Sequence, residues 1–335
     1  MNYYANMNSM WAGACKDLHA RGGVTQSRAG LTTEVVGWCG TLNDIDQNVL
    51  LTPLRKMDPA YACAELLWYV GGSGAVRMLC EYAPSYKRFA NPQTVDGVAH
   101  GAYGARWSDN PGFHAKRGVF SGQTQLDAVV ELLTKRPDSR QAVVTMWDSG
   151  DLHHAIEGDV NDVPCTVSMQ FLLRDKRLHC VTYMRSNDVW LGMPYDVFCF
   201  TSLQRVIANR LMALPGRYVH CVGSLHAYHS NFDKGFSLAT AGAMGPAAKY
   251  SNAAHGYAIH ALPTSEAAVD NERAIRESVT EGKAMVVDLG PGGLDPLSDA
   301  AILCARKLTK GAIGATATTP ALERAWDLKY GGAAC

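Results

Sequence analysis

The pattern of hydrophobic and polar residues predicts two clear helices in the first 140 residues. In the segment DPAYACAELLWYVGG, Asp58 suits the N-cap, Pro59 the first helical position and Gly71 the C-terminal stop. A second helix is expected over about residues 123–135. Its apolar side chains recur on one face, as expected of an amphipathic helix: Leu126, Val129, Val130 and Leu133.

Strand patterns follow. QAVVTMWD predicts one strand, and CTVSMQFLL and LHCVTYM, joined by the polar turn RDKR, predict a β-hairpin. The segment PYDVFCFTSLQRVIANRLMALPG is apolar nearly all round over its first half, which is typical of a buried central helix. RYVHCVGSLHAY then predicts a further strand.

The chain changes character after about residue 240. Ala/Gly-rich loops there alternate with helices expected near 265–281, 297–309 and 320–328. Mixed strands with interspersed helices predict an α+β layered fold, a mixed β-sheet packed with helices. We expect a single domain over residues 1–335, with 240–335 as helical additions.

Composition narrows the class of protein. With 47% hydrophobic residues in 335, the chain can form a large core, which excludes disorder for most of it. The 31 basic and 31 acidic side chains give no electrostatic footprint for duplex nucleic acid or an anionic membrane, although a local cationic pocket for one phosphate remains compatible. The N-terminus does not resemble a signal peptide and no apolar run reaches membrane length, so we expect a soluble, cytoplasmic protein.

The ten cysteines are scattered singly, with no CxxC pair. This usage indicates reduced, mostly buried thiols and gives no support for zinc. His153, His154 and Glu157 are close enough on a helix to bind a metal, but a surface cluster is the better interpretation of their spacing.

Two residues do not fit an ordinary core. Glu65 shares a helix face with Tyr61, Ala64 and Trp68, so it lies at the edge of an apolar stripe, is paired with a base, or is functional. Cys165, in DVPCTV, enters a strand after Pro164. It is either structural or a nucleophile, and a nucleophile would need a nearby cation to hold it as a thiolate.

The segment MRSNDVWLGMPYD is a candidate phosphate-holding corner, because Arg185 offers a bidentate fork and Ser186 a hydroxyl donor. The competing interpretation is a solvated loop with a helix cap at Asp196. His226 and Tyr228, two residues apart on a strand, point to the same face. They either hydrogen-bond a sugar or are satisfied within the sheet.

Together these segments resemble the thymidylate synthase superfamily. The shared motifs follow one order and spacing over residues 28–230: Arg28 after a polar turn, AELLWYVGG, GAYGARW, RPDSRQAVVTMWD, VPCTV, YMRSNDVWLGMPYD and VGSLHAY. The most specific match is R-S-x-D-x-x-L-G-x-P. The resemblance implies the family's layered fold and a homodimer formed through the sheet.

The resemblance also implies roles for individual residues. Cys165 would add to C6 of a pyrimidine ring, and Glu65 would organise water and proton transfers there. The phosphate would be held by Arg28, Arg185, Ser186 and, from the second subunit, Arg140. Tyr103 would line the pocket, while His226 and Tyr228 would hold the sugar hydroxyl. Asp188 and Phe89 would belong to the folate site.

One departure from the family bears on the substrate. Asp196 stands where the synthase has Asn. A carboxyl group can accept from the N4 amino group of cytosine and share a proton with N3, whereas a charged acid facing O4 of uracil forfeits a hydrogen bond, at a cost of about 1–3 kcal/mol. Asp196 therefore favours cytosine and a resemblance to the cytidylate hydroxymethylase branch known from bacteriophages and nucleoside-antibiotic pathways.

Four further positions depart from the family, and the terminal KYGGAAC does not match its closing C-terminal tail. The substituted positions are Asp148 for Asn, Gln141 for Arg, Thr166 for His and Ser224 for Asp. The expected activity is transfer of a one-carbon unit from 5,10-methylenetetrahydrofolate to C5 of dCMP, with no metal, to give 5-hydroxymethyl-dCMP. The alternatives are a 5-methyl product, CMP as substrate, an ordinary thymidylate synthase, and a non-catalytic binder of pyrimidine nucleotides.

Overall fold

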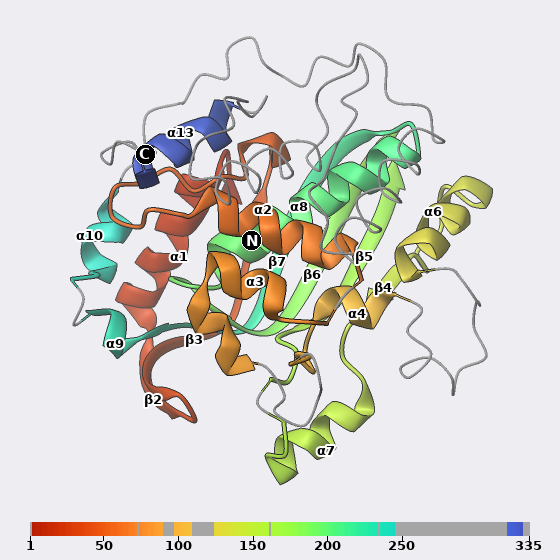
Figure 1. The fold of residues 1–335 in the computed structure, drawn as a ribbon. Coiled ribbons are helices and arrows are strands. Elements are labelled where there is room, and N and C mark those ends of the chain that lie inside the picture. The colour runs from red at the N-terminus through yellow and green to blue at the C-terminus, as the bar shows by residue number, and fades with distance from the viewer. Residues whose placement is uncertain are drawn as a thin grey trace.

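The computed structural model describes residues 2–72, 74–89, 97–108, 124–160, 162–232, 235–244 and 320–330. The helices expected near 265–281 and 297–309 lie outside the described residues. The helices that it describes are α1 (Met7–Arg21), α2 (Pro59–Val70), α3 (Arg77–Tyr82), α4 (Tyr103–Trp107), α6 (Gln125–Lys135), α7 (Ser149–Glu157), α8 (Met193–Arg210), α9 (His229–Phe232), α10 (Leu238–Ala243) and α13 (Pro320–Tyr330), with 3₁₀ turns at Ile45–Gln47 and Pro84–Phe89 (Figure 1).

A mixed sheet forms the base of the fold. Its strands run in the order β1-β3-β7-β6-β5-β4, with β2 paired to β3. The pairs β1–β3 and β6–β7 are parallel and the remaining pairs are antiparallel. The strand bounds are β1 (Asn2–Tyr4), β2 (Gly23–Ser27), β3 (Gly30–Leu42), β4 (Val143–Thr145), β5 (Thr166–Arg174), β6 (Arg177–Asp188) and β7 (Leu214–Tyr228).

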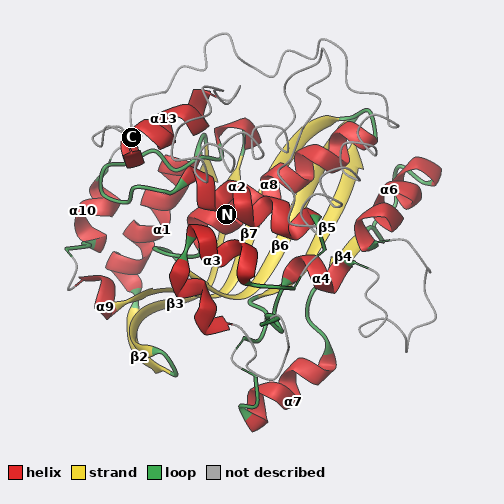
Figure 2. Ribbon diagram, viewed as in Figure 1, coloured by secondary structure: helices red, strands yellow, loops and turns green. Residues whose placement is uncertain are grey.

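The helices are layered on the sheet. Helix α8 packs on β6 and β7, α2 packs on α8, and α1 packs on β3. Figure 2 shows this arrangement, with α2 and α8 in front of the strands. Because both faces of α8 are covered, fifteen of its eighteen residues are buried. The α+β layered fold predicted from the sequence is confirmed.

The predicted elements agree with the structure at the helix caps and at the hairpin turn. Asp58 caps α2 through its carboxylate, and Gly71 ends that helix. Helix α6 begins at Gln125, two residues later than predicted, because the Thr124 side chain forms the N-cap. The hairpin between β5 and β6 turns at Asp175 and Lys176, both with positive φ, as a two-residue turn requires.

The sequence reading missed the N-terminal elements β1, α1, β2 and β3. Helix α1 lacks a strong apolar stripe, since its buried face includes Asn8 and two alanines as well as large apolar residues. Strand β2 is mostly exposed. Helix α1 therefore lacks the apolar period of a helix and strand β2 lacks the apolar–polar alternation of a strand, and a sequence-based prediction depends on these patterns.

The three central strands share a change in side-chain direction. Strict alternation would bury every second residue, yet each strand has a step of three residues between successive buried positions near its middle or end, and β3 has an earlier one from Thr32 to Val35. The steps near the middle or end are Val35 to Trp38 in β3, Met184 to Asn187 in β6, and Val222 to Leu225 in β7. The switch points are neighbours, because Ser224 pairs with both Val36 and Ser186. The change turns Asn187 toward the helices and leaves Ser186 half-buried.

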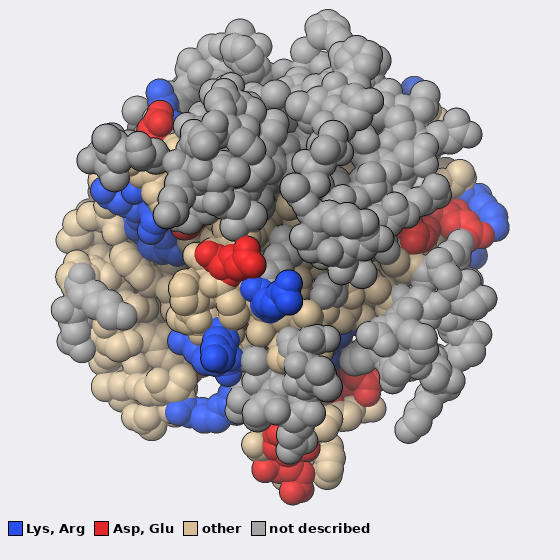
Figure 3. Space-filling model, in the orientation of Figure 1, with Lys and Arg blue, Asp and Glu red and all other residues tan. Residues whose placement is uncertain are grey.

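Charge on the surface is dispersed. In Figure 3 the basic and acidic side chains of the described residues form small separate groups on the face shown, rather than one extended patch. This distribution agrees with the equal numbers of acidic and basic residues. In the part of the chain that the structure describes, no helix has the length and apolar character needed to cross a membrane.

Candidate active site

Cys165 lies immediately before β5, at the point where the chain enters the sheet. Its carbonyl oxygen accepts a hydrogen bond from the backbone N–H of Arg185 on β6, at 2.8 Å. The next backbone N–H, that of Thr166, donates to the phenolic oxygen of Tyr103, at 3.1 Å. The backbone that carries the thiol is therefore fixed by β6 on one side and by α4 on the other.

Two donors face the sulfur of Cys165. The Arg185 guanidinium and the Ser186 hydroxyl each lie 3.6 Å from Sγ. The guanidinium is itself held by the carbonyl oxygens of Val163 and Pro164, at 2.8 and 2.9 Å. Burial raises the pKa of the Cys165 thiol, while Arg185 and Ser186 lower it, and burial is the larger effect. The corner contains the cation that a nucleophilic cysteine requires.

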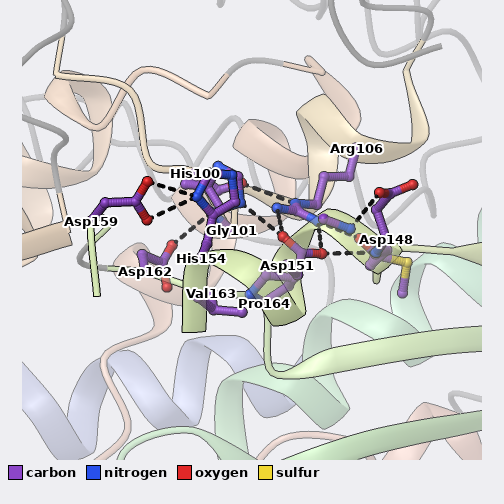
Figure 4. Close-up of polar contacts among 12 residues, drawn as sticks. His100, Gly101, Arg106, Asp148, Asp151, His154, Asp159, Asp162, Val163 and Pro164 are labelled. Carbon is purple, nitrogen blue, oxygen red and sulfur yellow. Dashed lines mark hydrogen bonds and ion pairs between the residues drawn. The ribbon is translucent and has the colours of Figure 1, made fainter. Parts of the chain in front are cut away.

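A buried ion pair anchors the segment that leads to Cys165. Arg106 on α4 makes two hydrogen bonds to the Asp151 carboxylate, at 2.6 and 2.7 Å, and both side chains are almost fully buried (Figure 4). Burial opposes ionisation of Asp151, but hydrogen bonds from His100 and Arg106 hold its pKa well below the ordinary value. Nearby, the Gly101 N–H donates to Asp162, three residues before the cysteine.

This anchor was not found from the sequence. Its partners are 45 residues apart, and only the position of Arg106 in GAYGARW gave any indication that the residue belongs near the site. Asp148, treated above as a departure from the family, has a local explanation: its carboxylate caps α7 by accepting from the N–H of Gly150.

Two acids approach each other between α2 and α8. Glu65 and Asp196 are 7% and 8% exposed. Glu65 accepts a hydrogen bond from the Tyr61 hydroxyl at 3.0 Å, and Asp196 accepts one from the Asn187 amide at 2.7 Å. Burial, and then the nearby charge of Asp196, raise the pKa of Glu65 to about 8. Burial also raises the pKa of Asp196 to about 7, against the hydrogen bond from Asn187.

Asp196 is not the helix cap that the competing interpretation assigned to it. Gly192 is the N-cap of α8, and Asp196 lies at the end of the first turn, where its own N–H donates to the Gly192 carbonyl. Its carboxylate faces the sheet at Asn187. Ser186 contacts Sγ of Cys165, and the next residue of β6, Asn187, contacts Asp196, so the thiol and the carboxyl group lie at the same end of β6. At this position the charge of Asp196 raises the pKa of Cys165 and of Tyr103.

The predicted sugar-binding residues lie on β7. His226 and Tyr228 are half-buried on the same face, with ring centroids 5.1 Å apart, while Leu225 and Ala227 are buried on the opposite face. Tyr228 is hydrogen-bonded to Ser27, the last residue of β2. In the pairing of β7 with β6, Ser224 is opposite Ser186 and His226 is opposite Asp188, so this end of β7 lies beside the residues of β6 that contact the thiol.

All three arginines expected around the phosphate are exposed, and the two outer ones lie in turns. Arg28 is exposed in the turn between β2 and β3, directly after Ser27. Arg140 is exposed in the turn before β4, where its carbonyl accepts from Gln170 on β5. Among the described residues, no hydrogen bond or ion pair joins Arg140 to Cys165 or Arg185 within one chain.

The predicted folate residues lie beside a row of aromatic rings. The Asp188 carboxylate accepts from the N–H groups of Trp190 and Leu191, at 2.9 and 3.2 Å, and so closes the turn before α8. The ring of Phe89 packs on Tyr86, at 5.0 Å between centroids. The sequence reading missed the rest of the row, which continues through Tyr61, Tyr195 and Trp190, with the Arg55 guanidinium over the last two rings.

The histidines considered for a metal do not form a metal site. His154 on α7 is hydrogen-bonded to Asp159 at 2.8 Å, at the surface. Within the described ranges, no group of three or more His, Cys, Asp or Glu side chains is arranged to hold a metal ion.

The fold and the site define an α+β protein with a cysteine–arginine corner where the chain enters β5, and two buried acids on the helices α2 and α8. A sequence profile of this architecture, described as thymidylate synthase, matches residues 9–241, and the chain belongs to the thymidylate synthase family. A thymidylate synthase from Buchnera aphidicola subsp. Baizongia pistaciae (strain Bp) is 30% identical over 168 residues. That match covers 50% of this chain and 59% of the relative.

Proposed function

We propose that the protein transfers a one-carbon unit to C5 of dCMP through a covalent bond between Cys165 and C6 of the ring. The observation that supports this proposal is a buried carboxyl, Asp196, whose partner Asn187 directly follows Ser186, the residue that contacts the Cys165 thiol. The family supplies the reaction type, and Asp196 supplies the preference for cytosine.

Cys165 would begin the reaction by adding to C6, which places negative charge on C5. Arg185 and Ser186 favour this step because both donate toward the sulfur and stabilise its thiolate form. They would also contact the nucleotide phosphate. Arg28 would approach from the β2–β3 turn, next to Ser27 and the sugar-binding residues His226 and Tyr228.

Asp196 would recognise the base. With a pKa near 7, this carboxyl group can hold or release a proton close to neutrality. It can therefore accept from N4 of cytosine and share a proton with N3, which draws electron density from C6 and makes that carbon a better electrophile. Uracil has an N–H at N3 and a carbonyl at C4, so it would lose one of these hydrogen bonds unless the oxygen of Asp196 that faces O4 carries the proton.

Glu65 would transfer protons at the ring. Its pKa near 8 keeps it mostly protonated at neutral pH, so it can donate a proton and later accept one, as a general acid–base residue should. Tyr61 donates to one of its oxygens and fixes the carboxyl group on α2. Tyr103, which is hydrogen-bonded to the segment after the cysteine, would form the adjoining wall of the pocket.

The aromatic row fits a folate. Flat rings on Tyr61, Tyr86, Tyr195 and Phe89 offer stacking surfaces for a pterin and its aminobenzoyl group. Bound 5,10-methylenetetrahydrofolate supplies the one-carbon unit at C5. Water addition to that carbon gives 5-hydroxymethyl-dCMP, the product we favour from the branch resemblance, whereas hydride transfer gives 5-methyl-dCMP.

A second copy of the chain would complete the site. The sheet face opposite α8 exposes apolar side chains: Val36 is 80% exposed, Tyr183 46% and Val143 41%. Covering this face would remove apolar area from water. In such a dimer, Arg140 would reach the phosphate of the partner's site, which agrees with its exposed position.

Tritium release tests the activity. The protein is incubated with 5,10-methylenetetrahydrofolate and dCMP, CMP or dUMP tritiated at C5, and the product is weighed by mass spectrometry. We expect release from dCMP and a hydroxymethyl mass. Cys165→Ser should abolish release, while Cys80→Ser, at a half-buried cysteine on α3, should retain it.

Other outcomes identify the alternatives. Release from dUMP alone would indicate an ordinary thymidylate synthase and contradict the role given to Asp196. Binding of dCMP without release from any nucleotide would indicate a non-catalytic binding protein. A product 16 mass units lighter than the hydroxymethyl nucleotide would indicate the methyl ending.

A further inference from the structure

A chain of buried hydrogen bonds leads from β7 to the carboxyl group of Asp196. The Tyr218 hydroxyl is 2.7 Å from Nδ1 of His220, and Nε2 of His220 is 2.9 Å from Oδ1 of Asn187. Nδ2 of Asn187 then donates to Oδ2 of Asp196, at 2.7 Å. Tyr218 and His220 are fully buried and Asn187 is 4% exposed, so water does not compete with these contacts.

The donors in this chain have one direction. Burial lowers the pKa of His220 to about 3, so the imidazole is neutral and carries a single N–H. Burial raises the pKa of Tyr218, which therefore keeps its phenolic hydrogen. Because Nδ2 of Asn187 donates to Asp196, its Oδ1 is the acceptor that faces Nε2, and the imidazole hydrogen therefore lies on Nε2. Nδ1 then has no hydrogen and accepts from the Tyr218 hydroxyl, whose oxygen is also hydrogen-bonded to Thr182.

The backbone of α8 leaves room for this contact only at a glycine. A Cβ atom on Gly192 would lie 2.8 Å from Nδ2 of Asn187 and 3.1 Å from Oδ2 of Asp196. The first distance is too short for a carbon and an amide nitrogen, so any larger residue would displace the Asn187 side chain. The Asn187–Asp196 pair and the glycine that covers it thus form one unit.

We propose that Asn187, oriented by His220 and Tyr218, is a positioning residue that makes Asp196 selective for cytosine. This inference rests on the proposed function of Asp196. An N–H donor on Oδ2 keeps that oxygen unprotonated, so the exchangeable proton of the carboxyl group is confined to Oδ1. Without the relay, the amide could rotate and accept a proton from Oδ2, which would change the hydrogen-bonding pattern offered to the base.

Asp188, at the end of β6, also acts on Asp196 and raises its pKa, whereas the hydrogen bond from the Asn187 amide lowers it. The charge of Asp196 in turn raises the pKa of the titratable groups around it: Glu65 and Tyr69 on α2, Tyr86, Tyr103 on α4, Cys165 before β5, Cys199 on α8 and Tyr218 on β7. Loss of the amide should therefore raise the pKa of Asp196.

Asn187→Leu removes the donor and keeps a similar volume. We expect kcat/KM for dCMP to fall about 10- to 100-fold, the loss typical of a hydrogen bond to an ionisable group, while that for dUMP changes less. The pKa of Asp196, followed by ¹³C NMR of the carboxyl carbon without substrate, should rise by about one unit or more. Thr41→Val, at a buried threonine on β3 outside the relay, is the control and should change neither quantity.

Tyr218→Phe tests the far end of the relay and removes only a hydroxyl group. It should lower the dCMP:dUMP ratio of kcat/KM in the same direction, by about 2- to 5-fold, because the imidazole hydrogen is no longer fixed on Nε2. Unchanged base preference in both variants would overturn the inference, even if both fold and the pKa of Asp196 shifts. A wild-type protein that uses dUMP and not dCMP would instead refute the proposed function, while an unshifted pKa of Asp196 in Asn187→Leu would refute the relay itself.

Discussion

Two buried regions of this protein treat carboxyl groups in opposite ways. Beside α4, Asp151 receives two hydrogen bonds from Arg106, one from His100 and one from a backbone N–H, and its pKa is lowered despite burial. Between α2 and α8, Glu65 and Asp196 accept hydrogen bonds from neutral groups and lie near other acids. Their pKa values rise to about 8 and 7. Partners, rather than burial alone, decide whether a buried acid is charged.

The two kinds of carboxyl group suit different roles. A fully compensated ion pair is rigid and always charged, which suits the segment that positions Cys165. An acid with a pKa near neutrality can exchange a proton during a reaction, which suits the groups proposed to act on the base. The following changes would break or sharpen this comparison, from the largest expected effect to the smallest.

Removal of the Arg106 cation beside Asp151 should have the largest effect on the free energy of unfolding. Arg106→Met leaves the Asp151 carboxylate buried without its main partner, so the free energy of unfolding should fall by about 3–5 kcal/mol. Urea denaturation followed by circular dichroism measures this loss. A loss below about 1 kcal/mol would show that Asp151 is compensated without Arg106.

Removal of an acid between α2 and α8 should raise the free energy of unfolding rather than lower it. Asp196 ionises near its ordinary value of 3.8 in the unfolded chain but near 7 in the folded protein. The folded state therefore binds more protons between these values, and the free energy of unfolding falls as pH rises through that window. Asp196→Asn should remove this dependence and stabilise the protein by up to about 4 kcal/mol at pH 8.

Urea titrations at several pH values between 4 and 8 measure the effect of Asp196→Asn. The same variant should shift activity from dCMP toward dUMP, since an amide can satisfy both the N3–H and the O4 of uracil. Equal pH dependence of stability in the wild type and the variant would contradict the raised pKa of Asp196.

Substitution of Arg185 should have a smaller effect, on the ionisation of the Cys165 thiol. Arg185→Met removes the cation that lowers the pKa of Cys165, so this pKa should rise further and a smaller fraction of the thiol should be ionised at a given pH. Alkylation of Cys165 by iodoacetamide at fixed pH should slow about 10-fold, measured by peptide mass spectrometry. Ser186→Ala, which removes the weaker donor, should slow alkylation less.

Removal of an exposed ion pair should have the smallest effect on the free energy of unfolding. Lys135 and Glu131 are paired on the surface of α6, where the lysine is 70% exposed. Lys135→Met should change the free energy of unfolding by no more than about 0.5 kcal/mol, because water and salt screen the pair. A loss as large as that of Arg106→Met would mean that burial is not what distinguishes the two arrangements.

Local rules determined several parts of this protein from the sequence by itself. Asp58, Pro59 and Gly71 set the bounds of α2, because capping and the φ of proline act within one turn. The motifs around Cys165 and Arg185 identified the corner before its geometry was known. The departure at Asp196 was visible as a single residue within an otherwise intact motif.

Only the tertiary structure decided which partners these residues meet. Arg106 and Asp151 are 45 residues apart, and Asn187 and His220 are 33 residues apart on different strands. The packing of α4 against α7 brings the first pair together, and the pairing of β6 with β7 together with the change of side-chain direction in the sheet brings the second. Neither arrangement leaves a periodic pattern in the sequence. Because a buried group's charge depends on its neighbours in space, the sequence determined that Glu65 and Asp196 are acids, and the fold decided that they hold protons near neutral pH.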